Sequence, residues 1–134
     1  MLSLEKEVNM KKVISTDNAP KAIGPYSQAI LHNSTLYCSG QIAINAKTGK
    51  LVTDNILNET DQVMQNILAI LKAANMDFKN VVKCSIFMID ITHYDDINTV
   101  YSKYFNSKPP AREAVQVSVL PKNVNVEISA IAIY

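Results

Sequence analysis

A single arginine stands out among the cations of this chain. Lysine and arginine together number 13 in 134 residues, and Arg112 is the one arginine. A guanidinium group binds a carboxylate through two parallel hydrogen bonds, which the ammonium group of lysine cannot do. Residues 112–120 alternate between apolar and polar, which predicts a strand that begins with Arg112, and we expect this side chain on the sheet face that the helices leave uncovered. Arg112 is a candidate for holding a carboxylate, and a structural ion pair is the alternative.

A glutamate interrupts the apolar run at the end of the sequence. Glu127 follows Val126 and precedes Ile128, so it lies within a predicted strand. A carboxylate in apolar surroundings is costly unless it is paired or functional. If the last two predicted strands form a hairpin, Glu127 converges with Arg112. A shared site and a plain salt bridge both remain open.

Two further features could line a site. Tyr26 follows a turn at residues 23–25, and Ser39, Gly40 and Gln41 interrupt a predicted strand. Glycine inside a strand often marks a bulge or the close approach of a ligand. Each feature alone is explained as simply by structure as by function.

Composition excludes several kinds of protein. The net charge is +1 with no basic patch, so neither nucleic acid nor membrane is an expected partner. The two histidines are far apart, which favours neither a metal site nor a catalytic triad. Cys38 and Cys84 both lie in apolar runs, so we expect two buried thiols in a reducing cytoplasm, without a disulfide or zinc.

The order of predicted elements is typical of an α+β domain, a single mixed β-sheet backed by two helices on one face. The chain reads β-β-β-α-β-α-β-β, and Asn58 and Thr92 are expected to cap the two helices. The predicted strands cover residues 13–15, 26–31, 35–44, 81–91, 112–120 and 124–134.

The other face of this sheet requires a cover. Residues 81–91 are apolar on both alternating faces, and two helices can cover only one of them. The charged content of 19% is also low for a small monomer. We therefore expect a homo-oligomer, built from one domain at residues 10–134 with residues 1–9 as a mobile extension.

Several short motifs, taken in order, resemble the reactive-intermediate deaminases, the Rid family. They are Asn18-Ala19-Pro20, Ile23-Gly24-Pro25-Tyr26, Ser39-Gly40-Gln41, Lys47-Thr48-Gly49, Asn98, Pro110-Ala111-Arg112, Leu120-Pro121-Lys122 and Val126-Glu127-Ile128. The resemblance runs from about residue 12 to residue 134, and it is strongest to the subgroup that hydrolyses 2-iminopropanoate and 2-iminobutanoate to 2-oxo acids and ammonia.

The resemblance implies a chorismate-mutase-like fold and a homotrimer with clefts between subunits, without metal or cofactor. By position, Arg112 should hold the substrate carboxylate and Glu127 the attacking water. Tyr26, Ser39, Gly40 and Asn98 should line the pocket, and Tyr26 should also take part in catalysis.

Two positions depart from the family pattern. Many members have a cysteine where this chain has Ala114, and many have a second glutamate at Ser129. The competing interpretation is a regulatory module that binds a small carboxylate in the same clefts without turnover. RNA cleavage, another role assigned in the family, finds no basic patch and no histidine pair in this sequence.

Overall fold

The framework of the protein is one six-stranded sheet in the order β1-β2-β3-β6-β4-β5. The structure is a computed structural model that describes residues 10–134, so the expectation for residues 1–9 lies outside the described residues. Only β4 and β5 pair in parallel, which makes the sheet mixed, as predicted. The strands are β1 Lys12–Ile14, β2 Ala29–His32, β3 Thr35–Gln41, β4 Val81–Met88, β5 Ala111–Gln116 and β6 Val126–Ile133.

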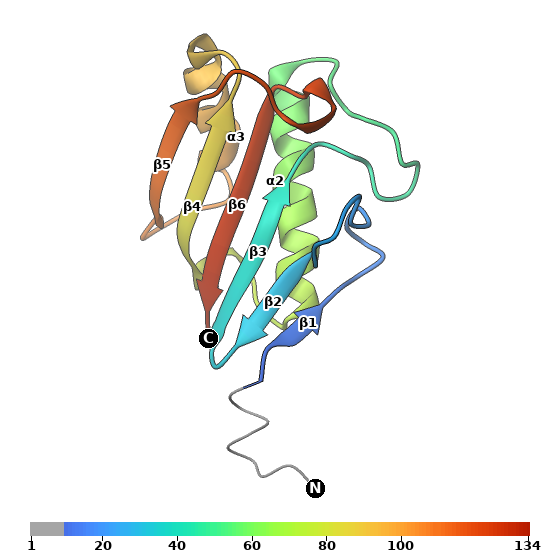
Figure 1. The fold of residues 1–134 in the computed structure, drawn as a ribbon. Helices are drawn as coiled ribbons and strands as arrows, with labels where there is room; N and C mark the ends of the chain where they lie inside the picture. Colours follow the sequence, from blue (N-terminus) through green and yellow to red (C-terminus); the bar gives the residue numbers. More distant parts are fainter. Residues whose placement is uncertain (1–9) are drawn as a thin grey trace, which may run out of the picture.

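Both helices pack behind this sheet, as predicted (Figure 1). Helix α2, Ile56–Ala73, buries an apolar stripe of Val63, Met64, Ile67, Ile70 and Leu71 against the strands. Helix α3, Tyr94–Ser102, is shorter and packs beside α2. Within residues 10–134, no helix is both long and apolar enough to cross a membrane.

The two predicted helix caps are wrong by a few residues. The N-cap of α2 is Asn55, whose side chain accepts a hydrogen bond from the Asn58 backbone nitrogen at 2.8 Å. Starting the helix before Asn58 brings Glu59 onto its inner face, where it is fully buried. At the second helix, Asp90 rather than Thr92 supplies the capping oxygen, for the short 3₁₀ turn Ile91–His93 that precedes α3.

The last two strands do not form a hairpin, which corrects the hypothesis drawn from the sequence. Strand β6 lies between β3 and β4, whereas β5 forms the edge beyond β4 (Figure 1). The 3₁₀ turn Pro121–Asn123 and its flanking residues carry the chain across to the centre of the sheet. Arg112 and Glu127 are thus held by strands that are not neighbours.

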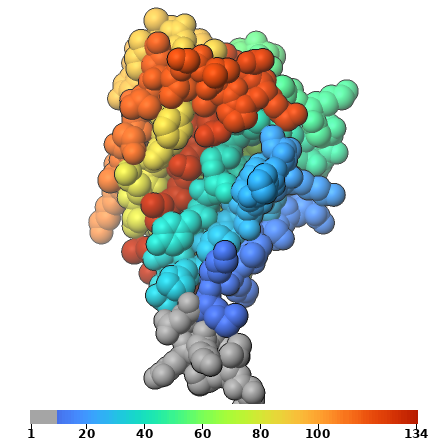
Figure 2. All heavy atoms as spheres, in the orientation of Figure 1, coloured from blue at the N-terminus to red at the C-terminus, as the bar shows by residue number. Residues whose placement is uncertain are grey.

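The sheet face opposite the helices is uncovered in the single chain (Figure 2). Strand alternation separates the buried side chains of β4 and β6, such as Cys84 and Ile128, from those on the open face. Large apolar side chains remain partly or largely exposed there, namely Tyr37, Phe87, Val115, Ile131 and Ile133. The sheet therefore presents an apolar surface that one chain leaves partly exposed.

Candidate functional site

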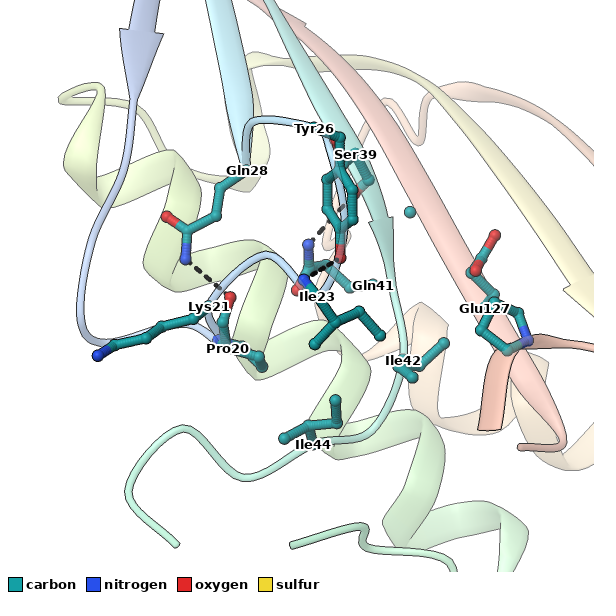
Figure 3. Close-up of a pocket in the computed structure, with 12 residues that line it drawn as sticks. Pro20, Lys21, Ile23, Tyr26, Gln28, Ser39, Gln41, Ile42, Ile44 and Glu127 are labelled. Atoms are coloured by element: carbon teal, nitrogen blue, oxygen red, sulfur yellow. Dashed lines mark hydrogen bonds between the residues drawn. The ribbon is translucent and has the colours of Figure 1, made fainter. Parts of the chain in front are cut away.

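A pocket of about 450 Å³ lies where β3 ends and β6 begins (Figure 3). It brings together four of the six residues predicted for the site: Tyr26, Ser39, Gly40 and Glu127. Its wall also contains the polar residues Lys21, Gln28 and Gln41. The apolar part is formed by Pro20, Ile23, Ile42, Ile44 and Pro121.

Glu127 supplies the carboxyl group of this pocket. It lies on β6 opposite Phe87 of β4, so its side chain rises from the open face of the sheet. Burial raises the pKa of this carboxyl group above its ordinary value. A carboxyl group whose pKa is shifted toward neutrality is better suited to exchange a proton with a reacting group near pH 7.

Gly40 makes room for this carboxyl group. The pairing of β3 with β6 shifts register between Cys38 and Gln41, which is a bulge at Gly40. A Cβ atom at residue 40 would lie 2.7 Å from Glu127 Oε2 and 2.8 Å from Glu127 Cδ. The group that closely approaches this strand glycine is the Glu127 side chain of the same chain.

Tyr26 and Ser39 form the side of the pocket next to the preceding loop. The Tyr26 hydroxyl accepts a hydrogen bond from the Ile23 backbone nitrogen at 3.2 Å (Figure 3). The Ser39 hydroxyl donates to the Ser27 carbonyl at 2.6 Å. Ser39 therefore fixes the segment that carries Tyr26, with its own proton directed to the backbone.

Gln28 is a site residue that the sequence analysis missed. Its side chain is buried, accepts from the Thr16 nitrogen at 2.7 Å, and donates to the carbonyls of Thr16, Ala19 and Pro20. These bonds hold the loop that forms one wall of the pocket. The one signal in the sequence was a glutamine at the start of an apolar strand.

Glu59 is a second residue that the analysis missed. Its carboxylate is fully buried and accepts from the Asn125 backbone nitrogen and Nδ2, both at 2.7 Å, and from the Val126 nitrogen at 3.2 Å. It ties α2 to the start of β6, two residues before Glu127. The signal in the sequence was an acidic residue on the apolar stripe of the helix. This signal can be recognised only when the helix is taken to begin at Ile56.

Arg112 lies away from this pocket, and its predicted face is wrong. It pairs with the buried residue Cys84, and its guanidinium carbon lies 4.9 Å from the centre of the Tyr101 ring on α3. The side chain is therefore on the helix-covered face, opposite to Glu127. Alternation assigns residues to two faces but does not state which face the helices cover.

A second cluster of polar groups forms around Arg112. Its Nη2 donates to the Tyr94 hydroxyl at 3.1 Å. This guanidinium and a hydrogen bond with Asn98 lower the pKa of Tyr94, so Asn98 belongs to the same cluster. The pocket residues on one side, and Arg112 with Asn98 on the other, form two separate clusters in one chain.

Arg112 has no acidic partner within residues 10–134. The ion pairs in this part of the chain are Lys79 with Asp77 and Lys83 with Glu113. The alternative of an Arg112–Glu127 salt bridge within one chain is therefore wrong, because β4 separates their strands and the side chains point to opposite faces.

The cysteines are buried and free, as predicted. Burial is the main cause that raises the pKa of Cys38 to about 12, and it also raises the pKa of Cys84. No cluster of three or more histidine, cysteine or acidic side chains suited to a metal ion occurs in the described part of the chain.

Comparison with known proteins identifies the family of this chain. A family model described as Endoribonuclease L-PSP matches residues 16–134. A protein of the conserved Rid family from Yersinia pestis, solved by crystallography, has a TM-score of 0.91 and 48% identity, with 93% of this chain and all of that chain (100%) covered. The chain therefore belongs to this family, and the resemblance inferred from the motifs is confirmed.

Two relatives are more informative about chemistry. Human 2-iminobutanoate/2-iminopropanoate deaminase is 48% identical over 124 residues, which cover 92% of this chain and 90% of the human protein. The crystal structure of E. coli TdcF with bound serine has a TM-score of 0.89 and 36% identity, and covers 92% of this chain and 98% of that chain.

Proposed function

We propose that this protein hydrolyses 2-iminopropanoate and 2-iminobutanoate, and the enamines from which they form, to 2-oxo acids and ammonia. The observation that carries the proposal is the half-buried Glu127 carboxyl, held over Gly40 with its pKa raised, in a pocket large enough for a small imino acid. The name of the human relative, 2-iminobutanoate/2-iminopropanoate deaminase, supports the same substrates.

The chemistry requires little from the protein. Water adds through oxygen to the imine carbon, the carbon–nitrogen bond breaks, and nitrogen leaves as ammonia while the carbonyl forms. Glu127 accepts one proton from the water and returns it to the nitrogen, which gives a carbinolamine. The remaining hydroxyl proton passes through the same carboxylate to the nitrogen as the carbon–nitrogen bond breaks, so the carboxylate is regenerated. A positioned acid or base of this kind contributes about 10²- to 10⁴-fold, and orientation of the imine adds to it.

The carboxylate of the substrate requires a cation, and the proposed cation is Arg112. Because Arg112 and Asn98 lie outside the Glu127 pocket of their own chain, we infer that they serve the pocket of a second copy. The apolar open face supports such an assembly, because association would bury it. The proposed assembly is a homotrimer; the number three is implied by the family resemblance.

The non-catalytic alternative, a module that only binds a small carboxylate, needs the Arg112 cluster but gives Glu127 no role. The raised pKa of Glu127 favours proton transfer over plain binding. A net charge of +1 fits a small anionic substrate better than nucleic acid. A cytoplasmic location is part of the proposal, and two buried free thiols fit a reducing compartment.

The test is a competition for the imine. L-alanine and an amino-acid oxidase generate 2-iminopropanoate in place, and semicarbazide traps it as it forms. The protein should divert imine to pyruvate faster than buffer does, and Glu127→Gln should abolish the gain. If the wild-type protein does not reduce the amount of imine that semicarbazide traps, the proposed function is wrong. A native mass that differs from that of three chains would overturn the trimer.

A further inference from the structure

We propose that Tyr94 is a positioning residue that aims the Arg112 guanidinium at the substrate carboxylate. This inference rests on the proposed function, in which Arg112 binds that carboxylate. Tyr94 is the first residue of α3; it is 39% exposed, and its hydroxyl faces Arg112.

Two tyrosines of α3 hold the guanidinium from different directions. The Tyr94 hydroxyl accepts a hydrogen bond from Nη2 at 3.1 Å. The guanidinium carbon lies 4.9 Å from the Tyr101 ring centre and 5.6 Å from the Tyr94 ring centre, within the range of cation–π contacts. The Tyr101 ring is buried and forms a fixed support. The hydrogen bond to Tyr94 then defines how the planar group is turned.

The chemical type of this partner matters. A guanidinium has five N–H donors in a fixed fork, and Tyr94 takes a donor without bringing a formal negative charge. An aspartate or glutamate in its place would neutralise Arg112 and compete with the substrate carboxylate. Within residues 10–134 Arg112 has no such acidic partner. Tyr94 thus orients the cation while leaving its charge available for a ligand.

The kinetic consequence follows from the chemistry of the reaction. The substrate carboxylate keeps its charge throughout hydrolysis, so Arg112 binds it about equally in the ground state and the transition state. Loss of the Tyr94 hydroxyl should therefore weaken binding and leave kcat nearly unchanged. For one hydrogen bond, a loss of about 3- to 10-fold is expected.

The experiment compares Tyr94→Phe with Tyr134→Phe. The Tyr134 hydroxyl donates to the Ala74 carbonyl at 2.7 Å, so the control also loses one tyrosine hydrogen bond, away from Arg112. Calorimetry measures Kd for pyruvate, in which oxygen replaces the imine nitrogen, and the semicarbazide competition measures kcat/KM. In Tyr94→Phe, Kd should rise and kcat/KM should fall by the same factor, and neither should change in the control.

A double variant separates positioning from a general structural effect. In an Arg112→Lys background the fork is absent, so Tyr94→Phe should have little further effect on Kd. An equal loss in both backgrounds would overturn the proposal. An unchanged Kd in Tyr94→Phe would overturn the proposal as well. This includes a fall in kcat/KM without a change in Kd, because partial unfolding of the variant gives that result.

The two proposals can fail separately. A wild-type protein that hydrolyses no imine, but binds pyruvate more tightly than Tyr94→Phe does, overturns the proposed function and supports the role of Tyr94. Imine hydrolysis by wild type with an equal kcat/KM in Tyr94→Phe overturns only the role of Tyr94. A protein that neither hydrolyses imine nor binds pyruvate overturns both.

Discussion

The Glu127 carboxyl group lies directly over Gly40, so closely that a methyl group on residue 40 would come within 2.7 Å of Oε2. The bulge in β3 and the start of β6 meet at this contact, and Glu59 ties that start to helix α2. The position of the proposed base is therefore set by the backbone on one side and by a buried carboxylate on the other.

Gly40→Ala should displace the Glu127 side chain and lower kcat/KM at least about tenfold, a fraction of what a positioned base contributes. The end of a glutamate side chain can swing aside, so the melting temperature should change little. Gly24→Ala is the comparison variant, because a Cβ there meets the Tyr26 ring at 3.6 Å, an ordinary contact that leaves the ring in place. Equal kcat/KM in wild type and Gly40→Ala would contradict the role given to this contact.

Glu127→Gln should lower the hydrolysis rate by about 10²- to 10⁴-fold, the contribution of a positioned base. It should also stabilise the protein at neutral pH. Because burial raises the pKa of Glu127, the folded state disfavours the ionised carboxyl, and this penalty is present above the folded pKa. The penalty disappears as pH falls below the unfolded pKa, where the carboxyl is protonated in both states.

The measurement for this pH dependence is the difference in melting temperature between Glu127→Gln and wild type. The difference should favour the variant at pH 7 and shrink toward zero as pH is lowered through the range of ordinary carboxyl pKa values. A variant that is less stable than wild type at pH 7 would indicate that the ionised carboxylate has a stabilising partner in the assembled protein.

Arg112→Lys should fail nearly as badly as Arg112→Ala. Lysine keeps the charge but not the planar fork, and charge-assisted hydrogen bonds of this type are worth about 1.5–3 kcal/mol, or about 10- to 100-fold in kcat/KM. The exposed residue Lys72, changed to arginine, controls for exchange of the two cations. Near-normal kcat/KM in Arg112→Lys would favour a structural arginine.

Two inactive variants should form active mixed assemblies if Arg112 and Glu127 of one pocket come from different chains. Arg112→Ala supplies an intact Glu127, and Glu127→Gln supplies an intact Arg112. In mixed assemblies from equal co-expression, about a quarter of the pockets should contain both functional residues. Activity that stays at the level of the separate variants would place both groups in one chain or exclude the shared cleft.

The sequence was sufficient for the framework of this protein because its apolar periods are local. The apolar run at residues 81–91 predicts a strand, and the structure has β4 at Val81–Met88. The apolar residues Val63, Met64, Ile67 and Leu71 recur at helical spacing, as they do on the buried side of α2. The ends of elements were less certain. Both Asn55 and Asn58 can cap a helix. In the helix that Asn55 caps, Glu59 bonds to Asn125, which is distant in the sequence, and short-range patterns do not predict this contact.

Local sequence patterns do not show which strands pair with each other. Nothing in residues 112–120 indicates that they pair in parallel with β4 rather than with β6. The prediction that Arg112 and Glu127 meet in a hairpin was therefore wrong. Four residues named from the motifs, Tyr26, Ser39, Gly40 and Glu127, line one pocket. The motifs could not reveal that Arg112 lies outside this pocket, with Tyr94 as its partner.

The two thiols have a consequence for the durability of such a protein. Imines and enamines are electrophiles or their precursors, and a cysteine reacts with electrophiles through its nucleophilic thiolate. Cys38 and Cys84 are buried with raised pKa values, so both remain protonated at neutral pH. Ala114, two residues after Arg112, adds no sulfur to that strand. In the proposed function, reactive compounds pass through the pocket at every turnover, and the two buried, protonated thiols offer them no ready nucleophile.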